Sequence, residues 1–446
     1  MTRGRDSGPR SAAPLERLLA PRREQFVREH WGRTPLLVPA ADRAACLPGT
    51  HAADDFADLF SPAAVDELIS RRGLRTPFLR LAQAGRTLGE REFTTGGGVG
   101  AGIDDQLDED AIRRRFAAGA TIVLQALHRT WPPLADFTGA LATELGHPAQ
   151  VNAYVTPPGN QGFAAHYDVH DVFVLQVHGG KSWRIHPPVW PDPLRDQPWE
   201  VRRTAVAAAA AAEPLLATEL RPGDVLYLPR GYLHSATASA DVSIHLTVGV
   251  HTWTRAHLVD AALDHVRRAL ADEPSLRATL DLGVNVASPA DLARDADAVR
   301  AAIAAALEAV TPTTLATALH GRARAAQRQA ALPVLAQVAA ADALAPVDIL
   351  VARPGLMATV EEPSNPADDG RGTDVVVRSR AGRFRAPAAA TPALLRLLAG
   401  EPVTVADLHP SDGAAALAIA RTLMVEGVAA LGPSLASQAA ATGGVG

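Results

Sequence analysis

The sequence predicts an α+β protein whose central part is an antiparallel β-barrel or sandwich. Between residues 150 and 255, short strand-like runs such as "VNAYVTP" and "DVLYLPRGYLHSA" are separated by Pro and Gly, which is typical of antiparallel barrels. Later in the chain, alanine- and leucine-rich stretches with apolar residues at helical spacing dominate. At 446 residues the chain is too long for one small core, so we expect two or three domains.

The residues before the barrel are expected to add flanking helices and strands. Residues 1–14 are interpreted as a disordered tail. "PLERLLAPRREQFVREHWGRTPLLVP" (14–39) predicts an amphipathic helix and then a strand, with Pro35 at the change. "AAVDELISRRG" (63–73) predicts a helix that ends at a glycine. "LDEDAIRRRFAAGATIVLQAL" (107–127) predicts a helix, a turn and a β-branched strand.

The residues after the barrel are expected to be helical and then mixed. Residues 256–345 contain helix-period stretches such as "HLVDAALDHVRRAL". "EEPSNPADDGRG" (361–372) has the composition of a linker. A hairpin, "TDVVVRSRAGRFRAP", follows it, and two helices separated by a turn complete a small α+β segment that ends at residue 431. Residues 433–446 are interpreted as a mobile tail.

Composition excludes several classes of protein. The formal net charge of −5 and the single Cys46 argue against a nucleic-acid-binding surface and against a cysteine-zinc cluster. The first 14 residues are charged and lack an apolar core, so we do not expect a signal peptide. No uncharged apolar stretch is long enough for a membrane span, and the alanine-rich run at 205–217 is expected to be a helix or insert. We therefore expect a soluble cytoplasmic protein.

The stretch "HYDVHDVFVLQVHGGKSW" (166–183) contains the first candidate for a metal site. If His166 and Asp168 lie on a strand, their side chains point to the same face. An imidazole and a carboxylate would then provide two of the three arms of a facial triad, which leaves open positions on Fe(II). A lone H-x-D pair also occurs by chance in many proteins, so the third arm decides the interpretation.

The third arm is expected from "GDVLYLPRGYLHSA" (223–236), where Pro229 and Gly231 bend the chain and His234 points back. The spacing of glycine, proline and histidine in this stretch resembles the second motif of the cupin superfamily. His170 is the main rival ligand, because on a strand it would point to the same face as His166 and Asp168. A triad drawn from one strand would be crowded, so we rank it second. The other histidines of the barrel region are expected at the surface or in hydrogen bonds.

Four further residues are expected around the metal. Lys181 follows the Gly179-Gly180 turn and should begin the next strand, where its ammonium could pair with the distal end of a dicarboxylate co-substrate. The alternative is a turn lysine that faces solvent. Asn152 and Tyr154 share a face of the preceding strand and could hydrogen-bond the same carboxylate, or could simply line the barrel. Thr247 is a weaker member of the set.

Together these motifs resemble the JmjC-type ribosomal oxygenases, bacterial and nucleolar. The residues that carry the resemblance lie in "NAYVTPPGNQGFAAHYDVHDVFVLQVHGGKSWRIHPP" (152–188) and "LRPGDVLYLPRGYLHSATAS" (220–239). The framing segments "FVREHWGRTPLLVP" and "FAAGATIVLQALHRTWPPL" also match. The resemblance implies a double-stranded β-helix (cupin/JmjC) barrel with flanking helices over 15–255. It also implies a helical dimerisation region over 256–345 and a winged-helix-like domain over 346–432.

The resemblance also implies a function. His166, Asp168 and His234 match the iron ligands, and Lys181 matches the residue that pairs with the C5 carboxylate of 2-oxoglutarate. Asn152, Tyr154 and, more loosely, Thr247 fall at co-substrate contacts. The implied activity is Fe(II)- and 2-oxoglutarate-dependent hydroxylation, with O₂, of an arginine or histidine side chain in a ribosomal protein or other peptide. The implied assembly is a homodimer. The alanine-rich insert is a departure from better-known members.

Three other functions are weighed against this one. A cupin with non-oxygenase metal chemistry usually presents three histidines and a glutamate, whereas aspartate stands in the H-x-D motif here. An oxygenase of a biosynthetic peptide or small molecule would use the same metal site. A non-catalytic barrel with a DNA-binding C-terminal domain is a further rival. Residues 374–431 hold six arginines against five acidic residues, a balance that does not suit a surface that binds phosphates.

Overall fold

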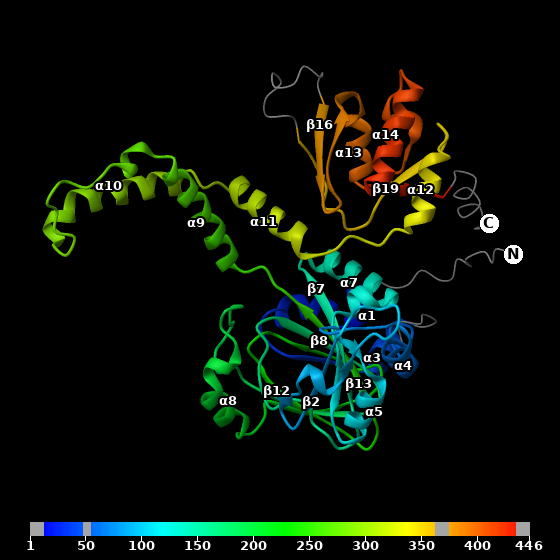
Figure 1. The fold of residues 1–446 in the computed structure, drawn as a ribbon. Coiled ribbons are helices and arrows are strands. Elements are labelled where there is room, and N and C mark those ends of the chain that lie inside the picture. The colour runs from blue at the N-terminus through cyan, green and yellow to red at the C-terminus, as the bar shows by residue number, and fades with distance from the viewer. Residues whose placement is uncertain (1–12, 48–54, 362–373, 434–446) are drawn as a thin grey trace. The chain divides into compact units, whose positions relative to one another are not determined.

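The computed structural model describes residues 13–47, 55–361 and 374–433 (Figure 1). The expected N-terminal tail, the linker at 361–372 and the C-terminal tail fall almost entirely outside the described residues. Contacts between residues divide the chain into two compact units, Met1–Thr252 and Trp253–Gly446. Each unit is described by itself below, and the finer domain boundaries expected from the sequence stay predictions.

The first unit contains two main antiparallel sheets. The larger has the order β1-β11-β8-β13-β7-β6-β2-β3 and the smaller has the order β10-β9-β12, with a two-stranded ribbon of β4 and β5 beside them. The strands are β1 (Leu36–Val38), β2 (Leu79–Gln83), β3 (Arg86–Thr87), β4 (Thr94–Thr95), β5 (Gln106–Leu107), β6 (Thr121–Leu124), β7 (Ala149–Thr156), β8 (Asp171–His178), β9 (Lys181–His186), β10 (Leu216–Leu220), β11 (Val225–Leu228), β12 (Leu233–Ala238) and β13 (Ser243–Val250).

The two sheets pack face to face, as the alternation along β8 shows. Val172 and Val174 join Trp183 of β9 in a core cluster between the sheets. Phe173 and Leu175 point the opposite way into the main core under the helices. Because both faces of β8 are buried, its sequence is an almost continuous apolar run. The antiparallel barrel predicted from residues 150–255 is confirmed.

The helices of the first unit are, in sequence order, α1 (Pro14–Leu19), α2 (Arg23–Gln25), α3 (Ala40–Cys46), α4 (Pro62–Arg71), α5 (Glu109–Ala117), α6 (Leu127–Thr130), α7 (Pro132–Leu145) and α8 (Arg203–Ala210). The last of them, α8, contacts β12 of the smaller sheet. The single helix expected at the start of 14–39 is interrupted. The helix α1 ends at Leu19 because Pro21 follows, and proline has no N–H for an intrahelical hydrogen bond. The chain becomes helical again at Arg23 and forms a π-helical turn over Phe26–His30 before β1.

The second unit begins with four helices and ends in an α+β segment. The helices are α9 (Arg255–Ala271), α10 (Pro289–Glu308), α11 (Pro312–Ala326), α12 (Val334–Asp342), α13 (Thr391–Leu398) and α14 (Gly413–Val425). The strands are β14 (Ile349–Ala352), β15 (Thr359–Glu361), β16 (Asp374–Ser379), β17 (Gly382–Pro387), β18 (Val403–Thr404) and β19 (Ala429–Leu431). They form two three-stranded sheets, β18-β14-β19 and β15-β16-β17. The hairpin predicted after the linker is β16–β17.

The helices α10 and α11 bury no residue within the described chain. Three apolar residues of α10, Val299, Ile303 and Leu307, recur every four positions and stay exposed. No single helix of the described ranges has the length and apolar character that a membrane span needs; α10 and α11 meet that standard only as a pair, bent by 80°.

Candidate active site

Three side chains predicted to bind a metal meet in a pocket between the two sheets. His166 and Asp168 lie in the segment that joins β7 to β8, and His234 lies near the start of β12. One ligand atom from each of the three falls within 4.8 Å of the others. Asp168 Oδ2 is 3.7 Å from His234 Nε2, and the two imidazole rings are 4.4 Å apart between centroids. The three residues therefore converge on one point.

The expectation that His166 and Asp168 lie on a strand is wrong. Residues 157–170 form no strand, since the chain turns at Pro157, Pro158 and Gly159 after β7. His166 instead forms an isolated bridge with His234. The two side chains still converge, but a backbone bridge to His234 positions His166 in place of strand geometry.

The two imidazoles are oriented by backbone carbonyls. His166 Nδ1 lies 2.8 Å from the carbonyl oxygen of Ala164, and His234 Nδ1 lies 3.1 Å from the carbonyl oxygen of Tyr232. When each Nδ1–H donates to its carbonyl, the lone pair of Nε2 is left free to bind a metal. Such hydrogen bonds fix the tautomer and the orientation of metal-binding histidines.

The protonation states also suit metal binding. Burial, together with the neighbouring His166, lowers the pKa of His234 to about 4. Burial raises the pKa of Asp168, but the imidazoles of His170, His234 and His166 outweigh this effect and the net shift is downward. Near neutral pH the aspartate is therefore ionised and His234 is neutral, which are the forms that bind divalent metals.

His170, the rival ligand, is engaged elsewhere. Its ring stacks on His251 with 5.1 Å between centroids and an angle of 22°. It also lies flat against the backbone of Gly249, where an added Cβ would come within 2.6 Å of the imidazole. Among the described residues, one group of three or more His, Cys, Asp or Glu side chains lies close enough together to share a metal: His166, Asp168 and His234. Two imidazoles and one carboxylate form the donor set of Fe(II) oxygenase sites, with positions left open.

Lys181 begins β9 and lies in the same pocket. Its side chain is 4% exposed. The ammonium donates a hydrogen bond to Thr156 Oγ1 at 3.0 Å and lies 3.5 Å from His245 Nδ1. Burial lowers the pKa of Lys181 to about 7. Within the described chain it has no ion pair with a carboxylate, so a buried cation is left with neutral partners and suits an anionic ligand.

Of the three weaker candidates, the structure brings two into the pocket. Tyr154 and Thr247 line it, whereas Asn152 does not. Asn152 is paired with Thr247 across β7 and β13, but its side-chain oxygen accepts a hydrogen bond from the backbone N–H of Ala126 at 2.9 Å. A direct contact between Asn152 and a co-substrate stays a prediction.

The sequence argument missed His245. It is buried rather than at the surface, and its ring stacks on Tyr154 with 4.9 Å between centroids and an angle of 3°. Burial lowers its pKa well below the usual value, and the nearby Lys181 acts in the same direction. The two-residue spacing in "HLT" could have indicated His245 as a site residue, since His245 and Thr247 share a face of one strand. Thr156 gave no such signal, because hydroxyl residues are common in strands.

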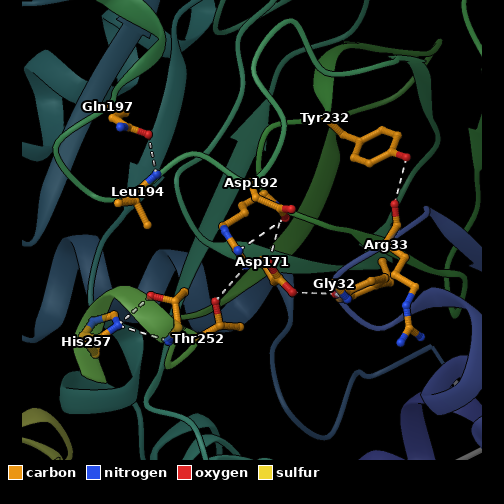
Figure 2. Close-up of polar contacts among 12 residues, drawn as sticks. Gly32, Arg33, Asp171, Asp192, Leu194, Gln197, Tyr232, Thr252 and His257 are labelled. Carbon is orange, nitrogen blue, oxygen red and sulfur yellow. Dashed lines mark hydrogen bonds and ion pairs between the residues drawn. The ribbon is translucent and has the colours of Figure 1, made fainter. Parts of the chain in front are cut away.

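A buried carboxylate fixes the turn that precedes His234. Asp171 Oδ2 accepts a hydrogen bond from Tyr227 OH at 2.5 Å, and Asp171 Oδ1 accepts one from the backbone N–H of Arg230 at 3.1 Å. Tyr227 OH in turn accepts the N–H of Gly32 at 2.8 Å. Figure 2 shows Asp171 at the centre of these contacts. The N–H of Gly231 also donates to the carbonyl of Asp168 at 2.9 Å, so a hydrogen bond joins the two segments that carry the candidate ligands.

The comparisons with known proteins agree with this geometry. Residues 133–258 match the model of a JmjC domain, a stretch that includes every residue of the pocket except Thr121. The chain is 34% identical to ribosomal oxygenase 1 of Gallus gallus over 247 residues, which are 54% of this chain and 37% of that protein. It is 30% identical to ribosomal oxygenase 1 of Homo sapiens over 252 residues, 55% of this chain and 36% of that one.

The chain carries a JmjC domain over residues 133–258 and resembles the ribosomal oxygenases.

Solved structures of a ribosomal oxygenase share the fold of this chain. The crystal structure of the Escherichia coli ribosomal oxygenase YcfD superposes with a TM-score of 0.50 at 18% identity and covers 92% of this chain and 98% of that one. A structure of YcfD in complex with cobalt and 2-oxoglutarate gives a TM-score of 0.51 at 19% identity and covers 93% and 99% of the two chains. At this identity the likeness shows the fold. The chain spans about a third of the length of the curated relatives it matches.

Proposed function

We propose that the protein is an Fe(II)- and 2-oxoglutarate-dependent oxygenase that hydroxylates an arginine or histidine side chain of a ribosomal protein or other peptide. The observation that carries the proposal is one pocket that holds both a 2-His-1-carboxylate set and a buried lysine with neutral partners. The first suits Fe(II) with open positions. The second suits the distal carboxylate of a dicarboxylate ligand.

The roles of the residues follow from their places. His166, Asp168 and His234 would hold the iron, and Lys181 would bind the C5 carboxylate of 2-oxoglutarate from the opposite end of the pocket. Tyr154 and Thr247 line the space between them and could donate hydrogen bonds to the co-substrate. The empty space in the pocket, open solvent at its mouth included, is about 540 Å³.

The bound iron would supply the activation of O₂. In the overall reaction, one oxygen atom enters succinate as 2-oxoglutarate loses CO₂, and the other becomes the hydroxyl group of the substrate. The surrounding chain contributes walls that exclude water. Val172, Val174 and Leu228 line the pocket with apolar surface, which protects a reactive centre from side reactions.

The test is direct. The purified protein is incubated with Fe(II), 2-oxoglutarate, O₂ and the ribosomal proteins of its host, and the proteins are analysed by mass spectrometry for a peptide heavier by one oxygen atom. An increase that requires both iron and 2-oxoglutarate supports the proposal. Oxidation of a free metabolite alone would contradict the peptide substrate, and binding of metal without any turnover of 2-oxoglutarate would favour a non-oxygenase cupin.

We further propose that the protein is a homodimer that forms through α9, α10 and α11. The support is the stripe of Val299, Ile303 and Leu307 on a helix that buries nothing within the described chain. Isologous packing of such faces is the commonest route to a dimer. We also propose that β14–β19 with α13 and α14 form a winged-helix-like domain for contacts with proteins. A cytoplasmic location stays a prediction.

A further inference from the structure

The side chain of Lys181 reaches from the smaller sheet of the barrel to the larger one. Lys181 is the first residue of β9, which belongs to the smaller sheet, whereas its two hydrogen-bond partners lie on strands of the larger sheet. Thr156, the last residue of β7, lies 3.0 Å from Lys181 Nζ through Oγ1, and His245 of β13 lies 3.5 Å from it through Nδ1. Two strands of one sheet therefore hold the ammonium of a residue from the other.

The contact with Lys181 decides which nitrogen of His245 carries the proton. A charged ammonium has three N–H donors and no acceptor, so Nδ1 of His245 must face it with a lone pair. The single proton of the neutral ring then lies on Nε2. The ring is neutral near pH 7, because burial and the nearby Lys181 hold the pKa of His245 well below its usual value. His245 is thus an acceptor toward Lys181.

Two aromatic side chains hold the ring of His245 in this orientation. Tyr154, its partner across β7 and β13, lies parallel to it with 4.9 Å between ring centroids and an angle of 3°. Trp183 meets it edge to face at 5.4 Å and 80°. The imidazole is 3% exposed, so a rotation that turned Nδ1 away from Lys181 would have to disturb both neighbours. The acceptor is therefore fixed in place.

The second acceptor, Thr156, is fixed as well. Its Oγ1 also accepts a hydrogen bond from Thr121 Oγ1 at 3.2 Å, and both threonines are fully buried. Two of the three N–H groups of Lys181 are thus directed at fixed acceptors. Within the described chain the third has no acceptor. Because the three N–H groups diverge from one nitrogen, fixing two of them also fixes the direction of the third.

We propose that His245 is a positioning residue for the co-substrate: its Nδ1 lone pair holds the ammonium of Lys181 so that the remaining N–H faces the distal carboxylate of 2-oxoglutarate. The inference rests on the proposed oxygenase function and adds a residue to it. Without Nδ1, the buried ammonium would keep only Thr156 as an acceptor, and the charged form that the carboxylate needs would be less favourable. His245 acts through Lys181 and needs no contact of its own with 2-oxoglutarate.

Three variants of His245 separate the roles of its two nitrogens. In His245→Asn the side-chain oxygen lies near the place of Nδ1 and can accept from Lys181, whereas in His245→Gln the amide lies near the place of Nε2. His245→Leu is of similar size and has no acceptor. The dissociation constant of 2-oxoglutarate is measured by calorimetry on the metal-loaded proteins. His245→Leu and His245→Gln should bind about tenfold more weakly than wild type, and His245→Asn should regain most of the affinity.

The matched control is His178→Asn, which removes an exposed imidazole at the end of β8 and should bind as wild type does. Metal content, determined on every sample, should be unchanged because the three ligands are untouched. Wild-type affinity in His245→Leu would overturn the inference, as would a His245→Asn that binds no better than His245→Gln. The Asn and Gln pair decides the matter even where the leucine variant does not fold. A metal-loaded wild type that fails to bind 2-oxoglutarate would overturn the proposed function, and the inference with it.

Discussion

The backbones of His166 and His234 are hydrogen-bonded in both directions. His234 N–H donates to the carbonyl of His166 at 2.8 Å, and His166 N–H donates to the carbonyl of His234 at 3.2 Å. The two residues are 68 positions apart in the chain, yet this bridge sets the distance between their rings. The main chain thus holds the two imidazoles of the candidate metal site next to each other.

Replacement of any of the three ligands should abolish iron retention. The alanine variants of His166, Asp168 and His234 each remove one of three donors, and the remaining two cannot hold Fe(II) at a facial site. His170→Ala is the matched control and should keep the iron, because its ring stacks on His251 away from the cluster. Iron content after desalting is the measurement. Normal iron in His234→Ala together with loss in His170→Ala would show that the third ligand is misassigned.

The affinity for 2-oxoglutarate should fall as the pH rises above 7. Burial lowers the pKa of Lys181 to about 7 in the free protein, so above this pH the lysine is mostly neutral. Binding of the dicarboxylate needs the charged form of Lys181, so above pH 7 the protein must take up a proton when it binds. The dissociation constant should then rise by up to about tenfold per pH unit between pH 7 and 9, and should be level just below pH 7. Calorimetry in buffers of different ionisation enthalpy measures this uptake, and a flat profile would exclude it.

Asp171 should be far more important for stability than Asp192, although both lie near Arg230. Asp171→Ala removes the acceptor of two buried hydrogen bonds, from Tyr227 OH and from the N–H of Arg230. It should lower the free energy of unfolding by about 3 kcal/mol. Asp192 is 63% exposed, so Asp192→Ala should cost less than about 1 kcal/mol. Urea unfolding of both variants gives the comparison. Equal losses would mean that the buried network does not hold the turn.

A charge on the exposed stripe of α10 should dissociate the proposed dimer. Ile303→Glu places a carboxylate in the middle of the apolar stripe, where burial against a second chain would leave it unpaired. Arg300→Glu, on the same helix at an exposed side chain, is the control. Light scattering across a range of concentrations should give twice the mass of one chain for wild type and control, and a single mass for Ile303→Glu. A monomeric wild type would refute the dimer.

The sequence was informative wherever a motif combined a fixed spacing with a distinctive residue type. Pro229, Gly231 and His234 predicted the bend before β12, and the glycines before Lys181 predicted the start of β9. Both are confirmed by the structure. The antiparallel barrel followed from alternation and from the placement of Pro and Gly. These signals are local, so a single sequence carries them.

Other features depend on partners that the sequence does not reveal. His166 was expected on a strand, but its place is set by a backbone bridge to His234. His245 was not among the predicted site residues, yet the register of β13 against β7 stacks it on Tyr154. Trp199 packs against the buried cluster of Tyr167, Val206 and Leu233, which come from separate parts of the chain. Such long-range contacts leave no periodicity in the chain.

The measurement that tests the account most directly is calorimetric binding of 2-oxoglutarate to metal-loaded wild type and to Lys181→Ala, with metal content determined on the same samples. The account predicts that 2-oxoglutarate binds the wild type only when the metal is present. Lys181→Ala should keep the metal but bind 2-oxoglutarate about 10- to 100-fold more weakly, since a charge-assisted hydrogen bond is lost, and Lys181→Arg should be intermediate. Equally tight binding by Lys181→Ala, or no binding by the metal-loaded wild type, would contradict it.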